Sequence, residues 1–191
     1  MKENNTFTNY IKPVIVLVVL CFVVTLALAY TYGVTHPIIS KRAERDADRA
    51  RAELLKEADG FDQYDGALAE SEDGNAKVTE CYNAKNGAGS VMTIETSSFG
   101  GKLTMMVGVD SNGSVTGVKV TDHQDTPGVG TKNFEEKYLD AYIGISDIHN
   151  ENVKSDDQID AISGASVTGQ ALHSGVSAAL RQYEMIGGTV Q

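Results

Sequence analysis

The sequence is poor in the residues that build metal sites and disulfide frameworks. Its 191 residues include two cysteines, four histidines, three prolines and no tryptophan. Cys21 and Cys81 lie far apart and form no C-x-x-C motif, and no two histidines have the spacing of a zinc site. There is also no Rossmann fingerprint. These absences argue against a zinc domain, an iron–sulfur protein, a disulfide-stapled domain and a dinucleotide-binding enzyme.

Positive charge is scarce as well. The chain has 16 Lys and Arg against 26 Asp and Glu, a net charge of −10. Residues 60–191 alone hold 8 basic and 19 acidic residues, a net −11. Such a surface repels nucleic acid and anionic lipid headgroups. We therefore exclude nucleic acid as a partner.

One long segment has no charged residue. Residues 14–34 read VIVLVVLCFVVTLALAYTYGV, which is 21 residues, and about 20 apolar residues span a bilayer as a helix. Ala27-Leu28-Ala29 resembles a signal-peptide cleavage site, but the apolar run continues past it and no strongly basic region precedes it. We expect an N-terminal tail at 1–13 and a single transmembrane helix at 14–34. This helix would anchor the protein in the lipid bilayer.

The segment after the span is expected to be a helical stalk and linker, residues 35–78. Within it, residues 40–57 mix opposite charges at helical spacing, which is typical of an exposed helix. Residues 58–78 are polar and contain several Gly and Asp. A folded domain is then expected at 79–191.

That domain is predicted to be α+β, with an antiparallel sheet followed by helices. Short apolar and β-branched runs lie at 90–97, 103–109 and 115–120, and Asn112-Gly113 is a hairpin signal between the last two. Two helices are expected afterwards. Phe134, Tyr138 and Tyr142 recur every four residues in 132–142, and 166–184 carries an apolar stripe of Leu172, Val176, Ala179, Leu180 and Tyr183.

A hydroxyl-rich turn stands just before the last predicted helix. Residues 160–168 read DAISGASVT and place three hydroxyls, from Ser163, Ser166 and Thr168, around Gly164. Free backbone N–H groups and the positive end of the helix dipole gather at such a place, which suits a phosphate group. The same pattern is also typical of a plain helix N-cap, and no lysine marks a Walker P-loop. The residues alone leave both interpretations open.

Two segments resemble motifs of proteins that carry FMN in phosphoester linkage. The stretch DAISGAS at 160–166 resembles the flavinylation signature D-x-x-[ST]-G-A-[TS], and DHQDTPGVG at 122–130 is similar to the family's H-x-E-T-P-G-x-G segment, with Asp125 in place of Glu. The turn at Phe99-Gly100-Gly101 is a third, softer match. The two main motifs stand in the family's order, about 35 residues apart as in that pattern.

The resemblance implies covalently bound FMN. In that family the last hydroxyl residue of the signature bonds the FMN phosphate, and a flavin transferase makes the bond with FAD and Mg²⁺. Carried over, the acceptor is Ser166, where the family more often has Thr, and Thr168 is the alternative. Asp160 would guide the transferase. Cofactor-binding roles would fall to Ser163, Gly164, Ala165, Val167 and Thr168, and to Thr126, Pro127, Gly128 and Gly130 in a loop near the flavin ring.

Over essentially its whole length the chain is similar to the G subunit of the Rnf complex. This implies an electron-transfer subunit, not catalytic alone, in an ion-translocating ferredoxin:NAD oxidoreductase of the cell membrane. The nicotinamide and iron–sulfur sites would lie on partner subunits. Three alternatives stay open: the related C subunit of the sodium-pumping NADH:quinone reductase, a membrane-tethered binding module without flavin, and a membrane-bound flavin reductase.

The charge pattern and the family resemblance predict opposite membrane topologies. Lys2 and Lys12 precede the span, whereas five basic residues follow it between 41 and 51, so the positive-inside rule places the C-terminal domain in the cytoplasm. The resemblance implies the opposite, because family members hold the flavin domain outside. We follow the resemblance, since the basic residues after the span alternate with acidic ones in a predicted helix.

Overall fold

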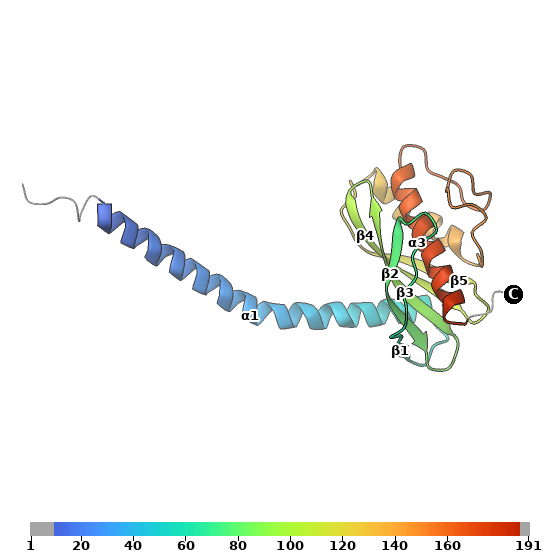
Figure 1. Ribbon diagram of the computed structural model, residues 1–191, viewed down its shortest axis with the longest axis horizontal. Coiled ribbons are helices and arrows are strands. Elements are labelled where there is room, and N and C mark those ends of the chain that lie inside the picture. Colours follow the sequence, from blue (N-terminus) through green and yellow to red (C-terminus); the bar gives the residue numbers. More distant parts are fainter. Residues whose placement is uncertain (1–9, 188–191) are drawn as a thin grey trace, which may run out of the picture. The chain divides into compact units, whose positions relative to one another are not determined.

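The computed structural model describes residues 10–187 (Figure 1). Most of the expected tail at 1–13, with Lys2, and the last four residues of the expected domain lie outside the described residues. The chain divides into two compact units, one ending at Ala47 and one beginning at Asp48.

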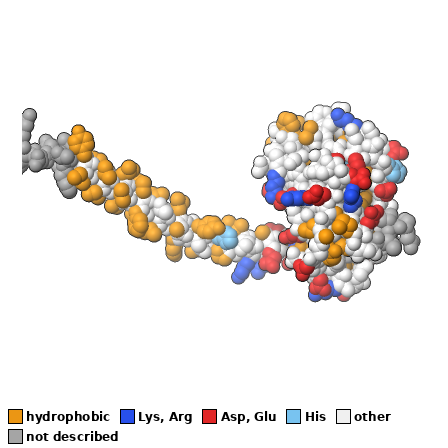
Figure 2. Space-filling view, viewed as in Figure 1, with side chains coloured by type: hydrophobic (Ala, Val, Ile, Leu, Met, Phe, Trp, Pro, Cys, Tyr) orange, Lys and Arg blue, Asp and Glu red, His pale blue; other side chains and the backbone are white. Residues whose placement is uncertain are grey.

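The expected span and stalk form one continuous helix, α1 (Lys12–Leu54), with Pro37 inside it. It is long and apolar enough to cross a membrane, and Figure 2 shows hydrophobic side chains along it. The Thr25 and Thr31 hydroxyls donate to carbonyls four residues earlier, Cys21 O at 2.7 Å and Ala27 O at 2.8 Å. These bonds satisfy the two threonine hydroxyls without water, as a lipid environment requires.

The domain is built on a five-stranded antiparallel sheet whose strands pair in chain order. The strands are β1 (Phe61–Gln63), β2 (Ala76–Ala84), β3 (Gly89–Ser98), β4 (Gly101–Asp110) and β5 (Val115–His123). The three strands expected from the sequence are β3, β4 and β5. β1 and the start of β2 fall within 58–78, which we expected to be a linker, because acidic and polar residues there hide a short alternation in which Ala76 and Val78 are buried.

The turn between β4 and β5 forms as its residues indicate. Gly113 has a φ of +84°, a conformation that favours glycine. The Asp110 carboxylate accepts hydrogen bonds from the N–H groups of Asn112, at 2.8 Å, and Ser114, at 2.9 Å. The predicted hairpin is thereby confirmed.

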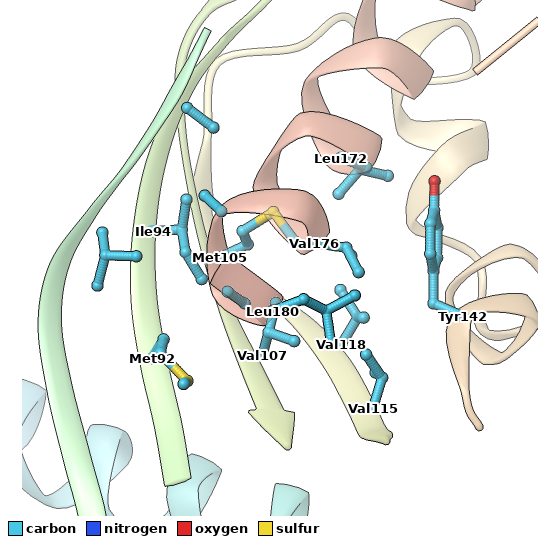
Figure 3. Close-up of a cluster of buried hydrophobic side chains, with 14 of the residues drawn as sticks. Met92, Ile94, Met105, Val107, Val115, Val118, Tyr142, Leu172, Val176 and Leu180 are labelled. Atoms are coloured by element: carbon cyan, nitrogen blue, oxygen red, sulfur yellow. The ribbon is translucent and has the colours of Figure 1, made fainter. Parts of the chain in front are cut away.

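The last helix, α3 (Ser166–Met185), packs across β2, β3 and β4 on one face of the sheet (Figure 1). Its predicted apolar stripe is buried. Figure 3 shows Leu172, Val176 and Leu180 of α3 facing a cluster from the sheet that includes Met92, Ile94, Met105, Val107, Val115 and Val118. Burial of each large side chain stabilises the fold by about 2 kcal/mol. This packed layer therefore holds α3 in position on the sheet.

The helix expected at 132–142 is not continuous. The chain forms the 3-10 helix η2 (Gly130–Phe134), one turn of α-helix α2 (Glu136–Leu139) and the 3-10 helix η3 (Asp140–Tyr142). The extended backbone of Glu135, with a ψ of 140°, separates the first two. The four-residue apolar spacing instead brings Phe134 and Tyr142 to the core from separate short turns.

The end of α1 belongs to the domain unit and packs on the sheet. Leu54 lies over Gly108 and Gly117, which are cross-strand partners in β4 and β5. A Cβ on Gly117 would come within 3.0 Å of the Leu54 side chain. The Arg51 guanidinium lies 3.6 Å from the centre of the Tyr82 ring, a cation–π contact. The exposed stalk expected at 40–57 is therefore buried in its last turn.

Candidate functional site

The first turn of α3 has no side-chain cap. Ala165 occupies the N-cap position, and its methyl group cannot accept a hydrogen bond. Gly164, just before it, has a φ of +83°, so the turn uses the backbone freedom of glycine. The hydroxyls of Ser163 and Ser166 therefore do not act as helix caps, and the first N–H groups of α3 keep their capacity to bind an anion.

Ser166 is half-buried and its hydroxyl makes no hydrogen bond within residues 10–187. The residue lines a cavity of about 320 Å³. The other residues around this cavity are mostly polar and include one cation, Lys154; they are Asn75, Ser97, Asn152, Val153, Lys154, Val167, Gln170 and Ala171. Ser166 thus presents a free hydroxyl to an open cavity whose lining mixes polar and apolar side chains.

Thr168, two residues further on, has the opposite surroundings. It is 1% exposed, and its Oγ1 donates a hydrogen bond of 3.2 Å to Asp125 Oδ1. Its hydroxyl is therefore both shielded from solvent and engaged with a carboxylate.

Asp125 joins three segments that are far apart in the sequence. It is 5% exposed, and its Oδ1 also accepts the Gly100 N–H at 2.9 Å. A Cβ on Gly130 would lie 2.7 Å from this oxygen and 2.9 Å from Thr168 Oγ1. The turn at 99–101, the loop at 122–130 and the start of α3 therefore meet at this one carboxylate.

Asn133 also connects the loop at 122–130 to the start of α3. The sequence analysis did not predict this residue. This buried side chain donates from Nδ2 to Gly130 O at 3.2 Å and to Ala165 O at 3.1 Å. No motif contains Asn133, so only the fold identifies it. We name Asp125, Asn133 and Thr168 the loop–helix clamp.

The remaining loop residues point outward. Thr126, Pro127 and Gly128 are exposed, and the Gly128 N–H donates to Thr131 Oγ1 at 2.8 Å. Gly130, by contrast, is buried inside the clamp. The close approach of Asp125 and Thr168 to this glycine indicates a packing role, because a side chain there would collide with both.

The signature residues divide between two cavities. Asp160 and Ser163 line a second space of about 390 Å³ together with Asn133, Lys137 and Tyr138, whereas Ser166 and Val167 line the first. Asp160 is exposed. The structure therefore separates the proposed acceptor from the residue expected to guide the transferase.

A buried polar network supports α3 beneath the second cavity. His173 Nε2 lies 2.8 Å from Asn150 O, so this nitrogen carries the proton, and Nδ1 faces the Tyr142 hydroxyl at 3.4 Å. Burial, together with the nearby Asp156 carboxylate, raises the pKa of Tyr142 above its ordinary value. Tyr142 therefore stays neutral, and its hydroxyl and the His173 ring support α3 from within the core.

Comparison with known proteins identifies the family. The family model of the FMN-binding domain matches residues 98–181, which include all three matching segments. The G subunit of the ion-translocating oxidoreductase complex of Methanosarcina acetivorans is 30% identical over 178 residues, covering 86% of this chain and 92% of that protein. The chain belongs to this family of G subunits.

Other G subunits also match over most of the chain. The G subunit of the proton-translocating ferredoxin:NAD⁺ oxidoreductase complex of Clostridium ljungdahlii is 25% identical, covering 95% of this chain and 94% of that protein. Its Na⁺-translocating counterpart in Acetobacterium woodii is 27% identical, covering 89% of each. The family therefore includes proteins named for either coupling ion.

Among solved structures, NqrC of Shewanella oneidensis matches with a TM-score of 0.42 and 20% identity, over 56% of this chain and 61% of that one. This similarity is too weak to add to the family assignment. The expected membership of the G-subunit family, the α+β fold and the FMN-binding domain are confirmed.

Proposed function

We propose that this chain carries FMN in phosphoester linkage at Ser166 and relays electrons in a membrane-bound, ion-translocating ferredoxin:NAD oxidoreductase. The observation that supports this most directly is the contrast between two hydroxyls in one helical turn. Ser166 is half-buried and its hydroxyl has no hydrogen-bond partner in the described part of the chain, whereas Thr168 is buried and donates to Asp125. Of the two candidate acceptors, only Ser166 is open to a transferase.

The surroundings of Ser166 suit a phosphodiester. Uncapped N–H groups and the helix dipole favour its negative charge. Lys154 adds a cation beside the same cavity, in a region of the chain whose net charge is −11. These groups would offset the repulsion that the acidic domain exerts on the phosphate.

Attachment requires a flavin transferase and FAD. The Ser166 hydroxyl oxygen would bond to the phosphorus of the FMN half of FAD while the pyrophosphate bond breaks. The hydroxyl proton would be lost and AMP would leave. The exposed Asp160 would contact the transferase from the neighbouring cavity.

Bound FMN would supply the capacity to accept and release electrons, and the chain would hold it in place and set its surroundings. The relatives are named as members of translocating complexes, which supports the other membrane, flavin and iron–sulfur subunits of such a complex as partners. We propose that residues 14–34 span the cell membrane and that the domain lies on its extracytoplasmic side.

A denaturing gel tests the attachment. Full-length chain produced with a flavin transferase should give a band that fluoresces under ultraviolet light after washing. Ser166→Ala should abolish the fluorescence, and Thr168→Val, which keeps the shape of the side chain, should retain it. Ser155→Ala is the control and should keep the fluorescence, because it removes an exposed hydroxyl that lies outside both motifs.

Two results would overturn parts of this proposal. A band that never fluoresces would favour a tethered binding module without covalent flavin. Fluorescence that survives Ser166→Ala but disappears in Thr168→Val would move the attachment to Thr168.

A further inference from the structure

The Asp125 side chain is buried in a place where a carboxylate is unfavourable. It is 5% exposed and contacts Thr168 in the first turn of α3, two residues after the proposed attachment site. Its Oδ1 accepts two hydrogen bonds, while Oδ2 is buried and has no hydrogen-bond partner among residues 10–187. Keeping a buried carboxylate oxygen without a partner costs free energy, so a compensating role is needed.

That role is not to bind the phosphate. A carboxylate only accepts hydrogen bonds, and its charge repels a phosphodiester. The two donors that it does hold are parts of the protein, the Gly100 N–H and the Thr168 hydroxyl. Asp125 therefore acts on the geometry of the helix start.

The clamp determines which hydroxyl is free. Donation to Asp125 keeps the Thr168 side chain turned into the core. Asn133 holds the carbonyl of Ala165, the residue before Ser166, against the loop. Ser166 lies between these two fixed points, and its hydroxyl is left facing the cavity that Lys154 lines.

We propose that Asp125 is a positioning residue that makes Ser166 the sole FMN acceptor, by holding Thr168 and the first turn of α3 in place. This inference rests on the proposed function. It gives the loop at 122–130 a role in the attachment of FMN, because the loop would orient the acceptor before any flavin is attached.

The test measures FMN transfer to purified full-length chain in detergent, with flavin transferase, FAD and Mg²⁺. Initial rates come from intact mass, and attachment sites come from peptide mapping. In Asp125→Ala, transfer to Ser166 should slow at least about tenfold, since a reacting group misplaced by about 1 Å can lose about a hundredfold in rate. Asp125→Asn keeps an oxygen at the Oδ1 position and should stay within about threefold of the wild-type rate.

Two further variants separate positioning from general stability. Asp122→Asn removes an exposed carboxylate three residues away and should leave the rate unchanged. Thr168→Val in the Asp125→Ala background should slow transfer no further than Asp125→Ala alone, because both changes break the same contact.

Distinct results would overturn this inference and the proposed function. If Asp125→Ala is modified at Ser166 at the wild-type rate, the positioning role is wrong and the acceptor assignment stands. Equal slowing in Asp125→Ala and Asp125→Asn would also contradict it, since the hydrogen-bonding oxygen would then not matter. If Ser166→Ala is still modified with Asp125 intact, the proposed acceptor itself is wrong.

Discussion

At the scale of single residues, the environment of a hydroxyl decides its chemistry more than its identity does. Ser166 and Thr168 share one helical turn and the same functional group. Their difference lies in burial and in one hydrogen bond to Asp125. Thr168 is a poor acceptor because its burial keeps a transferase from reaching its hydroxyl, although a neighbouring carboxylate could otherwise activate such a group as a general base.

A second carboxylate, Asp73, ties the segment before β2 to α3, and its pKa makes the tie sensitive to acid. Burial raises the pKa of this carboxyl, but hydrogen bonds from Ser174, Ser71 and Asn75 outweigh burial and lower it to about 2. Because the pKa is depressed on folding, the ionised form stabilises the fold above the unfolded value of about 4. That contribution is lost as the pH falls from about 4 through 2.

We therefore expect Asp73→Asn to lower the free energy of unfolding at pH 7 by about 1 kcal/mol, a figure already reduced for the exposure of the side chain. The difference from wild type should shrink between pH 4 and pH 2. Urea unfolding at several pH values measures it. A difference that stays constant down to pH 2 would contradict the role of the charge.

The site could be predicted from sequence only where its residues form a contiguous motif. The stretch 160–168 and the loop 122–130 are recognisable by their order and spacing, and the structure brings both to Asp125. Asn133 and Lys154 could not be found this way, since each is isolated in the sequence and reaches the site through the fold. The burial of Gly130 was equally hidden, because a glycine in a motif looks the same whether it faces a ligand or a packed side chain.

At the scale of elements, the sequence predicts best where one local signal dominates. β3, β4, β5 and α3 follow from β-branched runs, the Asn112-Gly113 turn and a helical stripe. The prediction of one helix at 132–142 was wrong. The aromatic spacing fits a helix, but the extended backbone of Glu135 interrupts it. β2 was partly missed because a register irregularity between Val78 and Glu80 interrupts the two-residue alternation of buried positions.

The last turn of α1 is an element whose role appears only in the structure. Leu54 fills the space above the Gly108 and Gly117 pair and is 8% exposed. We expect Leu54→Ala to lower the free energy of unfolding by about 2 to 3 kcal/mol, from lost burial and a residual cavity. Urea unfolding in detergent measures it, with Leu68→Ala as the control, because Leu68 is 40% exposed.

A loss in Leu54→Ala no larger than in the control would contradict the packing of α1 on the sheet. A larger loss would support the view that the anchor helix and the flavin domain are joined by a packed turn. Lys119 and Glu53 pair across the same contact, but an exposed ion pair of this kind adds little.

At the scale of the whole molecule, two features of the sequence predict opposite membrane topologies. The basic residues after the span favour a cytoplasmic domain, and the family resemblance favours the opposite side. We expect alkaline phosphatase fused to the C-terminus to be active, since it matures only outside the cytoplasm. A fusion beginning at residue 35, without the span, is the control and should be inactive. Fluorescence from a C-terminal green fluorescent protein, with inactive phosphatase, would show the reverse topology.

The central claim is that one serine at the start of α3 is esterified to FMN. Its most direct test is the intact mass of the full-length chain after production with a flavin transferase, followed by peptide mapping. The account predicts an added mass of about 440 Da from the covalent modification, located on Ser166 and absent from Ser166→Ala. An unmodified mass in a preparation whose transferase is shown to be active on another substrate would contradict it.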